Sequence, residues 1–168
     1  MNERKESTTS IILEYVRVIV LTVIATFIFL QFVQISRVNG SSMENTYFQN
    51  NIVLIDKVFY KHSQPKRNDI IIVDYDDGLD DTLIIKRVIA VGGDHLDIKN
   101  NEVYINGKKI KESYIKENMT TEDLSIDIPK GKVFVMGDNR NHSLDSRKLG
   151  YFDFDNDVIG KVFFKIPL

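Results

Sequence analysis

The hydrophobic residues of this chain form one long run and then many short ones. Residues 1–10 are polar, and Ile, Val, Leu and Phe dominate residues 11–35, with no charge between Arg17 and Arg37. Beyond Thr46, short apolar runs rich in β-branched residues alternate with turn-forming residues. The long run predicts a single helix, and the short runs predict a mainly antiparallel β domain, either an open sheet or barrel-like.

The long apolar run has the length of a transmembrane helix. Its uncharged part holds about 19 residues, roughly 28 Å at 1.5 Å per residue, which matches a hydrocarbon core of about 30 Å. A cleaved secretory signal is the alternative, because residues 40–42 could mimic its small-residue cleavage site. We predict a cytoplasmic tail over residues 1–10, a transmembrane helix over 11–36 and an extracytoplasmic catalytic β domain over 37–168.

Basic residues indicate how this helix is oriented. Arg4, Lys5 and Arg17 lie at its start, whereas Arg37 and the distant Lys57 follow it. Positive residues near a span favour the cytoplasmic side. We therefore expect a single-pass protein of the cell membrane, anchored in the lipid bilayer, with its N-terminus inside and its β domain outside.

The β prediction depends on alternation and on turn signals. Asn106-Gly107 predicts a two-residue hairpin between two of the strands. Residues 111–128 are polar and irregular, so we interpret them as a surface excursion. The aspartates around Gly78 miss the spacing of a calcium loop, so we interpret them as a solvated hairpin tip. Strands are expected at residues 52–55, 69–75, 82–91, 95–99, 102–105, 132–136 and 158–164.

Composition excludes several classes of site and partner. Cysteine is absent, so disulfides and thiolate metal sites are excluded. The three histidines, His62, His95 and His142, do not have metal-ligand spacing. The net charge is -2 at pH 7, which argues against a nucleic acid partner. We expect no metal and no cofactor.

Small and hydroxyl-bearing residues directly follow the long apolar run, in the stretch Val38-Asn39-Gly40-Ser41-Ser42-Met43-Glu44-Asn45-Thr46. Gly40 permits a tight turn that presents a serine together with its main-chain amide. Ser42 is therefore a candidate nucleophile. The alternative is a membrane-exit linker, because a serine cannot attack without a base.

Lys86 is the candidate base. It interrupts the apolar strand predicted over residues 82–91, and alternation places it on the opposite face from its neighbour Arg87. At least one of these cations must meet a hydrophobic face, and burial lowers the pKa of a lysine amine. The alternative is a solvated lysine on an edge strand.

A third polar stretch, residues 137–147, directly follows the strand predicted over 132–136. Loops in this position often carry a functional site. Asp145 and Arg147 could pair to fix the loop, and Ser143 could orient a nearby amine. The alternative is a turn stabilised only by local Asp and Asn hydrogen bonds.

Together these stretches resemble the type I signal peptidases, the membrane-bound Ser/Lys proteases of bacteria, and the Gram-positive members in particular. The resemblance covers nearly the whole chain. It rests on Gly40 to Thr46, on the Lys-Arg motif ending in Gly-Asp over residues 86–94, and on the Gly-Asp-Asn-Arg motif with its Ser-x-Asp-Ser-Arg tail over residues 137–147.

The resemblance implies a role for each matching residue. Ser42 takes the position of the nucleophile, with its main-chain amide at the oxyanion, and Lys86 that of the general base. Ser143 matches the serine that orients the lysine, and Asp145 and Arg147 match the supporting pair. Candidate contacts for small substrate residues are Val38, Met43 and Ile84.

Two residues depart from the family motif. Asn45 stands where the motif has proline, which removes a fixed dihedral and is expected to loosen the turn slightly. Gly40 has no hydroxyl to donate to the oxyanion, so the Ser42 amide would carry more of that stabilisation.

The implied function is removal of signal peptides from translocated, secreted preproteins, close to the secretion translocon. Two alternatives remain. A Ser/Lys self-cleaving regulator should carry a DNA-binding helical domain, and a non-catalytic paralogue that binds signal peptides should have lost Ser42 or Lys86. The sequence shows no such domain and retains both residues.

Overall fold

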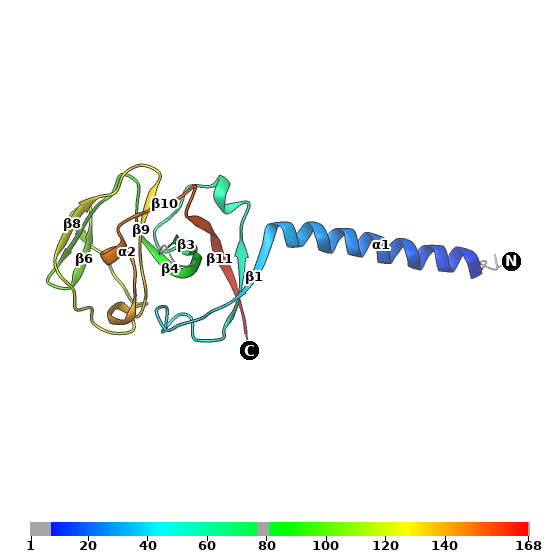
Figure 1. Ribbon diagram of the computed structural model, residues 1–168, viewed down its shortest axis with the longest axis horizontal. Coiled ribbons are helices and arrows are strands. Elements are labelled where there is room, and N and C mark those ends of the chain that lie inside the picture. The colour runs from blue at the N-terminus through cyan, green and yellow to red at the C-terminus, as the bar shows by residue number, and fades with distance from the viewer. Residues whose placement is uncertain (1–7, 77–80, 168) are drawn as a thin grey trace.

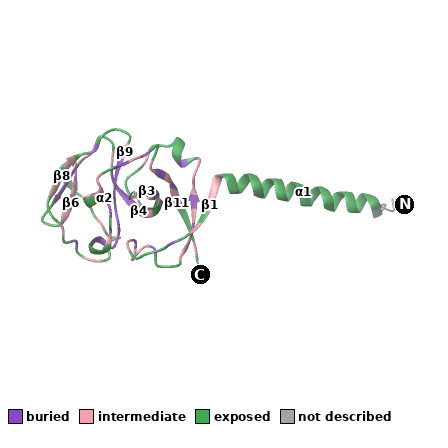
Figure 2. Ribbon diagram, in the orientation of Figure 1, coloured by how far each residue is buried: buried purple, intermediate pink, exposed green. Residues whose placement is uncertain are grey.

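The computed structural model describes residues 8–76 and 81–167. One long helix, α1 (Thr8–Phe32), extends away from a β domain (Figure 1). Residues 9–31 of this helix are exposed (Figure 2), and within the described residues α1 is the one helix long and apolar enough to cross a membrane. At about 1.5 Å per residue it is roughly 37 Å long, enough to span a hydrocarbon core. Most of the predicted tail lies outside the described residues.

The predicted helix end, residue 36, was wrong, because the helix ends at Phe32. The next residues form β1 (Val33–Arg37), which pairs antiparallel with β2 (Ile52–Asp56). The β-branched residues Val33 and Ile35 favour a strand, and the ladder to β2 replaces the helical hydrogen bonds. Hydropathy does not mark this change, because the apolar run continues from the helix into the strand. The sheet therefore begins directly after the helix.

A seven-stranded antiparallel sheet forms the larger part of the β domain, with the order β1-β2-β11-β3-β4-β9-β10. The prediction of a mainly antiparallel β domain behind one apolar helix is confirmed. The remaining strands of this sheet are β3 (Ile70–Asp76), β4 (Asp81–Val91), β9 (Lys132–Met136), β10 (Phe152–Asp153) and β11 (Val158–Ile166).

A second, four-stranded sheet has the order β7-β6-β5-β8. Asn106 and Gly107 both have positive φ, 51° and 76°, and they join β6 to β7 as the predicted hairpin. The interpretation of residues 111–128 as a surface excursion was wrong in part, because β8 lies within them and Met119 is buried. The predicted tip around Gly78 lies outside the described residues. The strands are β5 (His95–Lys99), β6 (Glu102–Ile105), β7 (Lys108–Lys109) and β8 (Leu124–Asp127).

Strand β4 contributes to all three buried hydrophobic clusters of the domain. Val88 packs in one cluster, Ile85 in a second, and Ile89 in the third, which joins the two sheets. Along β4, β3 pairs with residues 81–87, whereas β9 pairs only with residues 87–91. Among the described strands, the first half of β4 thus has an open edge on the side away from β3.

The part of the chain that the structure describes also holds three short helical segments. The 3-10 turn η1 (Tyr60–His62) follows β2. The 3-10 turn η2 (Arg140–His142) and the helix α2 (Ser146–Leu149) follow β9 and form part of the third polar stretch. Residues 137–147 reach the middle of β4 through Asp138, which pairs with Arg87.

Candidate active site

The side chains of Ser42 and Lys86 are in contact. Lys86 Nζ lies 2.8 Å from Ser42 Oγ and 3.0 Å from the main-chain oxygen of Ile85. Ser42 comes from the turn between β1 and β2, and Lys86 from the open half of β4. A hydroxyl and an amine at this distance have the geometry that a nucleophile and its base require.

Lys86 is buried, with 3% of its surface exposed. Burial lowers its pKa to about 8 because it disfavours the ammonium form, while the negative charge of Asp145 acts in the opposite direction. Among the described contacts, its hydrogen bonds go to a hydroxyl and a carbonyl. An appreciable fraction of this amine is therefore neutral near pH 8, which a base must be.

The turn that carries Ser42 is tightly built. Gly40 has φ 97°, in the left-handed region that favours glycine, and its N–H donates to Gln49 Oε1 at 2.7 Å. Met43 anchors the turn in the core with 1% of its surface exposed, and its carbonyl accepts the N–H of Thr46 at 3.0 Å. Among the described contacts, the N–H of Ser42 has no acceptor. It is free to donate to a substrate oxygen.

The loop after β9 holds the same turn from the other side. Asn139 N donates to the carbonyl oxygen of Ser42 at 2.9 Å. A Cβ at Gly137 would collide with that carbonyl and with Ser143 Oγ, so this close approach requires glycine. Sequence reasoning assigned no role to Asn139 or Gly137, although both lie in the motif that it singled out.

Asp145 and Arg147 form the predicted pair. Arg147 Nε and Nη2 each donate to the Asp145 carboxylate at 2.8 Å, and Gly137 N donates to it at 3.0 Å. Burial acts to raise the pKa of Asp145, but the hydrogen bonds from Arg147 and Gly137 hold it below its ordinary value. Ser143 Oγ lies over Gly137, and no hydrogen bond joins it to Lys86 among the described contacts.

The three predicted substrate contacts separate in the structure. Val38 lines a small groove of about 120 Å³ together with Leu83 and Ile85. Val38 and Met43 both belong to one buried core cluster, but Met43 is not among the residues that line this groove. Ile84 packs against the cluster that contains Val88, because alternation along β4 turns it away from Leu83 and Ile85.

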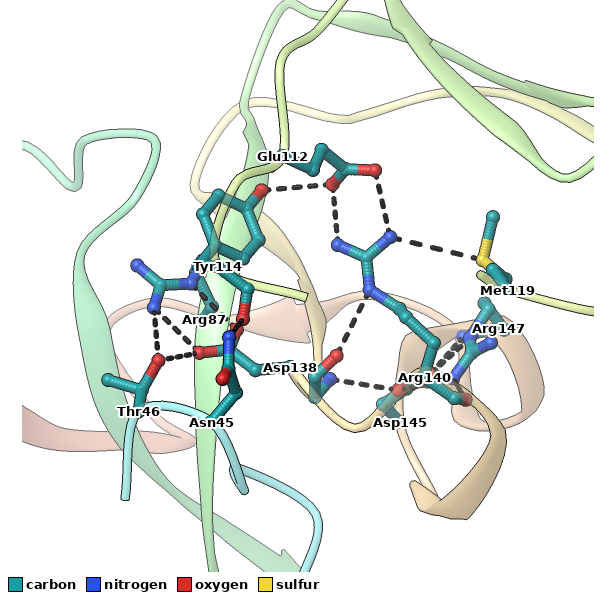
Figure 3. A network of polar contacts seen from close by, with 11 residues as sticks. Asn45, Thr46, Arg87, Glu112, Tyr114, Met119, Asp138, Arg140, Asp145 and Arg147 are labelled. Carbon is teal, nitrogen blue, oxygen red and sulfur yellow. Dashed lines mark hydrogen bonds and ion pairs between the residues drawn. The ribbon is translucent and has the colours of Figure 1, made fainter. Parts of the chain in front are cut away.

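Other charged side chains near the site pair with one another. Arg87 Nε and Nη2 donate to both oxygens of Asp138, at 2.8 and 2.7 Å. Arg140, which is fully buried, pairs with Glu112 (Figure 3). Within the described residues, no three His, Asp or Glu side chains are grouped to hold a metal ion.

Comparison with known proteins places the chain among proteases. A model of the family described as "Signal peptidase, peptidase S26" matches residues 12–166. The chain is 32% identical to signal peptidase I P of Bacillus subtilis subsp. natto, over 95% of this chain and 91% of that protein. It is 37% identical to signal peptidase I U of Bacillus subtilis (strain 168), over 73% of this chain and 70% of that protein.

A solved structure agrees with these similarities. The crystal structure of a signal peptidase I from Enterococcus faecalis V583 matches with a TM-score of 0.51 and 28% identity, covering 60% of this chain and 98% of that one. The family match across most of the chain, the curated relatives and the solved structure all point to signal peptidases. The chain therefore belongs to the signal peptidase family, peptidase S26, and is a serine endopeptidase of that family.

Proposed function

We propose that this protein is a membrane-anchored endopeptidase that cuts signal peptides from translocated preproteins, with Ser42 as nucleophile and Lys86 as general base. The observation that carries the proposal is the 2.8 Å contact between Lys86 Nζ and Ser42 Oγ. The amine is buried, and its pKa is lowered to about 8 by that burial. It is therefore suited to accept a proton from the serine near neutral pH.

The reaction follows from these positions. Ser42 Oγ attacks the carbonyl carbon of the scissile peptide, and neutral Lys86 takes the hydroxyl proton. The N–H of Ser42 donates to the oxyanion that forms. Lys86 then returns its proton to the leaving amine, which departs and leaves an acyl-enzyme. A water molecule, deprotonated by Lys86, hydrolyses the ester and restores Ser42.

Supporting roles fall to the loop after β9. The Asp145–Arg147 pair fixes this loop, and the charge of Asp145 favours the protonated form of Lys86 that exists during turnover. Ser143 lies over Gly137 beside the carbonyl oxygen of Ser42. There its hydroxyl helps to orient the lysine when substrate is bound.

The substrate binds as an added strand. Among the described strands, the first half of β4 has an open edge, where an extended peptide can hydrogen-bond to the main chain. The groove lined by Val38, Leu83 and Ile85 lies along this strand and is small. Small side chains before the scissile bond fit such a groove, and a signal-peptide cleavage site supplies them.

The membrane brings enzyme and substrate together. Helix α1 anchors the chain, and β1 follows it directly, so Ser42 is held near the outer surface of the bilayer. Exposed apolar side chains lie on β1, which follows the anchor, and on β11, which is separated from β1 by β2: Ile35, Phe163 and Phe164. The catalytic domain is extracytoplasmic, close to where the translocon delivers preproteins. Because of this orientation, protease added outside protoplasts should digest the region after Arg37.

A processing assay tests the function. Membranes carrying the wild-type chain should cleave a preprotein, whereas Ser42→Ala and Lys86→Ala should leave almost no activity. Ser41→Ala is the matched control, because Ser41 is the exposed neighbour of Ser42, and it should cleave normally. Full cleavage by Ser42→Ala or by Lys86→Ala would contradict the assigned dyad. No cleavage by the wild-type chain would favour the non-catalytic binding protein.

A further inference from the structure

A polar network contacts the turn that carries Ser42, residues 41–47, here called the nucleophile turn. This network takes no part in the proposed proton transfers. Thr46 Oγ1 donates to Asp138 Oδ2 and accepts a hydrogen bond from Arg87 Nη2 at 3.2 Å (Figure 3). Arg87 is 8% exposed and Asp138 is fully buried. The hydroxyl of Thr46 thus joins the turn that carries Ser42 to a buried ion pair.

Residues 112–116, here called the strap, lie across this ion pair. The ring of Tyr114 is 4.0 Å from the guanidinium carbon of Arg87, and Lys116 N donates to the carbonyl oxygen of Asp138 at 2.9 Å. Tyr114 OH donates to Glu112 at 2.9 Å, and Glu112 in turn pairs with Arg140. The strap is therefore fixed to the loop after β9 at both of its ends.

Asn45 connects the nucleophile turn to the strap. Its Nδ2 donates to the carbonyl oxygens of Tyr114 at 3.0 Å and Ile115 at 3.3 Å. Its φ is 90°, which proline, the residue of the family motif at this position, cannot adopt. The expectation that Asn45 merely loosens the turn therefore differs from the structure, in which its side chain ties the turn to a neighbouring segment.

We propose that Thr46 and Asn45 are positioning residues that keep Ser42 Oγ within reach of Lys86 by locking the nucleophile turn onto Asp138 and the strap. The proposal rests on the proposed roles of Ser42 and Lys86. The lock acts through a short path, because the N–H of Thr46 donates to the carbonyl of Met43, the residue next to Ser42. A displacement of about 1 Å at a reacting group costs about a hundredfold in rate.

The hydroxyl of Thr46 is tested by two variants of the full chain in detergent. Thr46→Val keeps the shape and leaves Asp138 bonded to Arg87, so the domain should fold, but kcat should fall by about tenfold to a hundredfold with KM unchanged. Thr46→Ser keeps the hydroxyl and should restore most of kcat. Thr120→Val, at an exposed threonine, is the control and should match the wild type. Wild-type kcat in Thr46→Val, or equal damage in both Thr46 variants, would overturn the role of this hydroxyl.

The backbone of Asn45 is tested separately. Asn45→Pro, which introduces the residue of the family motif, should lower kcat by about a hundredfold because φ must leave the left-handed region. Asn45→Gly keeps that conformation and loses only exposed side-chain bonds, so kcat should fall by only about two- to fivefold. Asn50→Gly is the matched control, since Asn50 also has positive φ, 70°. Wild-type kcat in Asn45→Pro would overturn the role of the Asn45 backbone, and wild-type kcat in Asn45→Gly would overturn the tie between its side chain and the strap.

Hydrogen exchange separates this proposal from the proposed function. In Thr46→Val, amides of residues 41–47 and of the strap should exchange faster than in the wild type, while β5 and β6 stay unchanged. That result supports the lock whether or not Ser42 is the nucleophile. If Ser42→Ala still processes preproteins, the proposed function fails. If Ser42→Ala is inactive but Thr46→Val shows neither faster exchange nor lower kcat, the lock alone fails.

Discussion

Lys86 and Arg87 are neighbours on β4, yet their surroundings differ completely. Both are nearly buried, at 3% and 8% exposed. Arg87 meets both oxygens of Asp138, the hydroxyl of Thr46 and the ring of Tyr114. Lys86 reaches a hydroxyl and a carbonyl. The two faces of one strand thus hold a fully paired cation and, among the described contacts, a lysine without a direct counterion.

The difference assigns the two residues to different tasks. A guanidinium keeps its proton in proteins, so a buried arginine needs a carboxylate, and Arg87 has one. A buried lysine without a direct counterion can instead become neutral, as the lowered pKa of Lys86 indicates. The ion pair of Arg87 stabilises the structure on one face, whereas the other face holds an amine whose pKa is lowered.

The largest expected effect on stability is on the Arg87 face. Asp138→Asn leaves a buried guanidinium without its anion and should lower the free energy of unfolding by about 3–5 kcal/mol. Denaturant unfolding of the full chain in detergent measures this change. Asp155→Asn, at an exposed aspartate, should change stability by less than about 0.5 kcal/mol. Equal free energies of unfolding for these two variants would show that the ion pair between Arg87 and Asp138 does not stabilise the domain.

Removing the charged group at Lys86 should stabilise the domain, whereas removing the charge of Asp138 should destabilise it. Burial lowers the pKa of Lys86 from its ordinary value of 10.5 to about 8, so between these values the unfolded chain binds more protons and stability rises with pH. Lys86→Met removes the buried ammonium and should stabilise the domain near neutral pH, by on the order of 3 kcal/mol.

The increase in the free energy of unfolding from Lys86→Met should be largest below about pH 8. It should disappear above about pH 10.5, where the wild-type amine is neutral in both the folded and the unfolded state. Thermal unfolding of both proteins across this range measures the difference. A variant less stable than the wild type at pH 7 would mean that the ammonium is not penalised by burial.

A smaller effect is expected at Ser143. Ser143→Ala should lower kcat by about tenfold, because a residue that orients the base is more dispensable than the base itself. The order of turnover, wild type above Ser143→Ala above Ser42→Ala, is the measured quantity. Turnover as low as in Ser42→Ala would place Ser143 in the proton path, and wild-type turnover would limit it to loop structure.

The elements with local signals could be predicted from the sequence. Hydropathy predicted a helix, short β-branched runs between turn signals predicted seven strands, and Asn106-Gly107 marked its hairpin. The three motif-bearing stretches that hold Ser42, Lys86 and Asp145 also meet in the structure. Each of these signals lies within a few neighbouring residues, so one sequence is enough to show it.

Features that depend on distant partners could not be predicted. The helix ends at Phe32 because β2 pairs with the residues that follow, which hydropathy does not show. Alternation separates Ile84 from Ile85 without showing which one faces the groove. Tyr114 was assigned to a polar surface segment, but it packs against Arg87, a residue far away in the sequence.

The pH dependence of kcat/KM tests the central claim most directly, namely that Lys86 is the base. The rising limb reports the base of the free enzyme, and activity should rise as Lys86 loses its proton, with a midpoint near its pKa of about 8. Lys86→Ala should remove the limb together with the activity, and Lys86→Arg should be equally inactive. A limb near the ordinary histidine pKa of about 6.5 that survives Lys86→Ala would contradict the account and implicate His142 or His95 as the base.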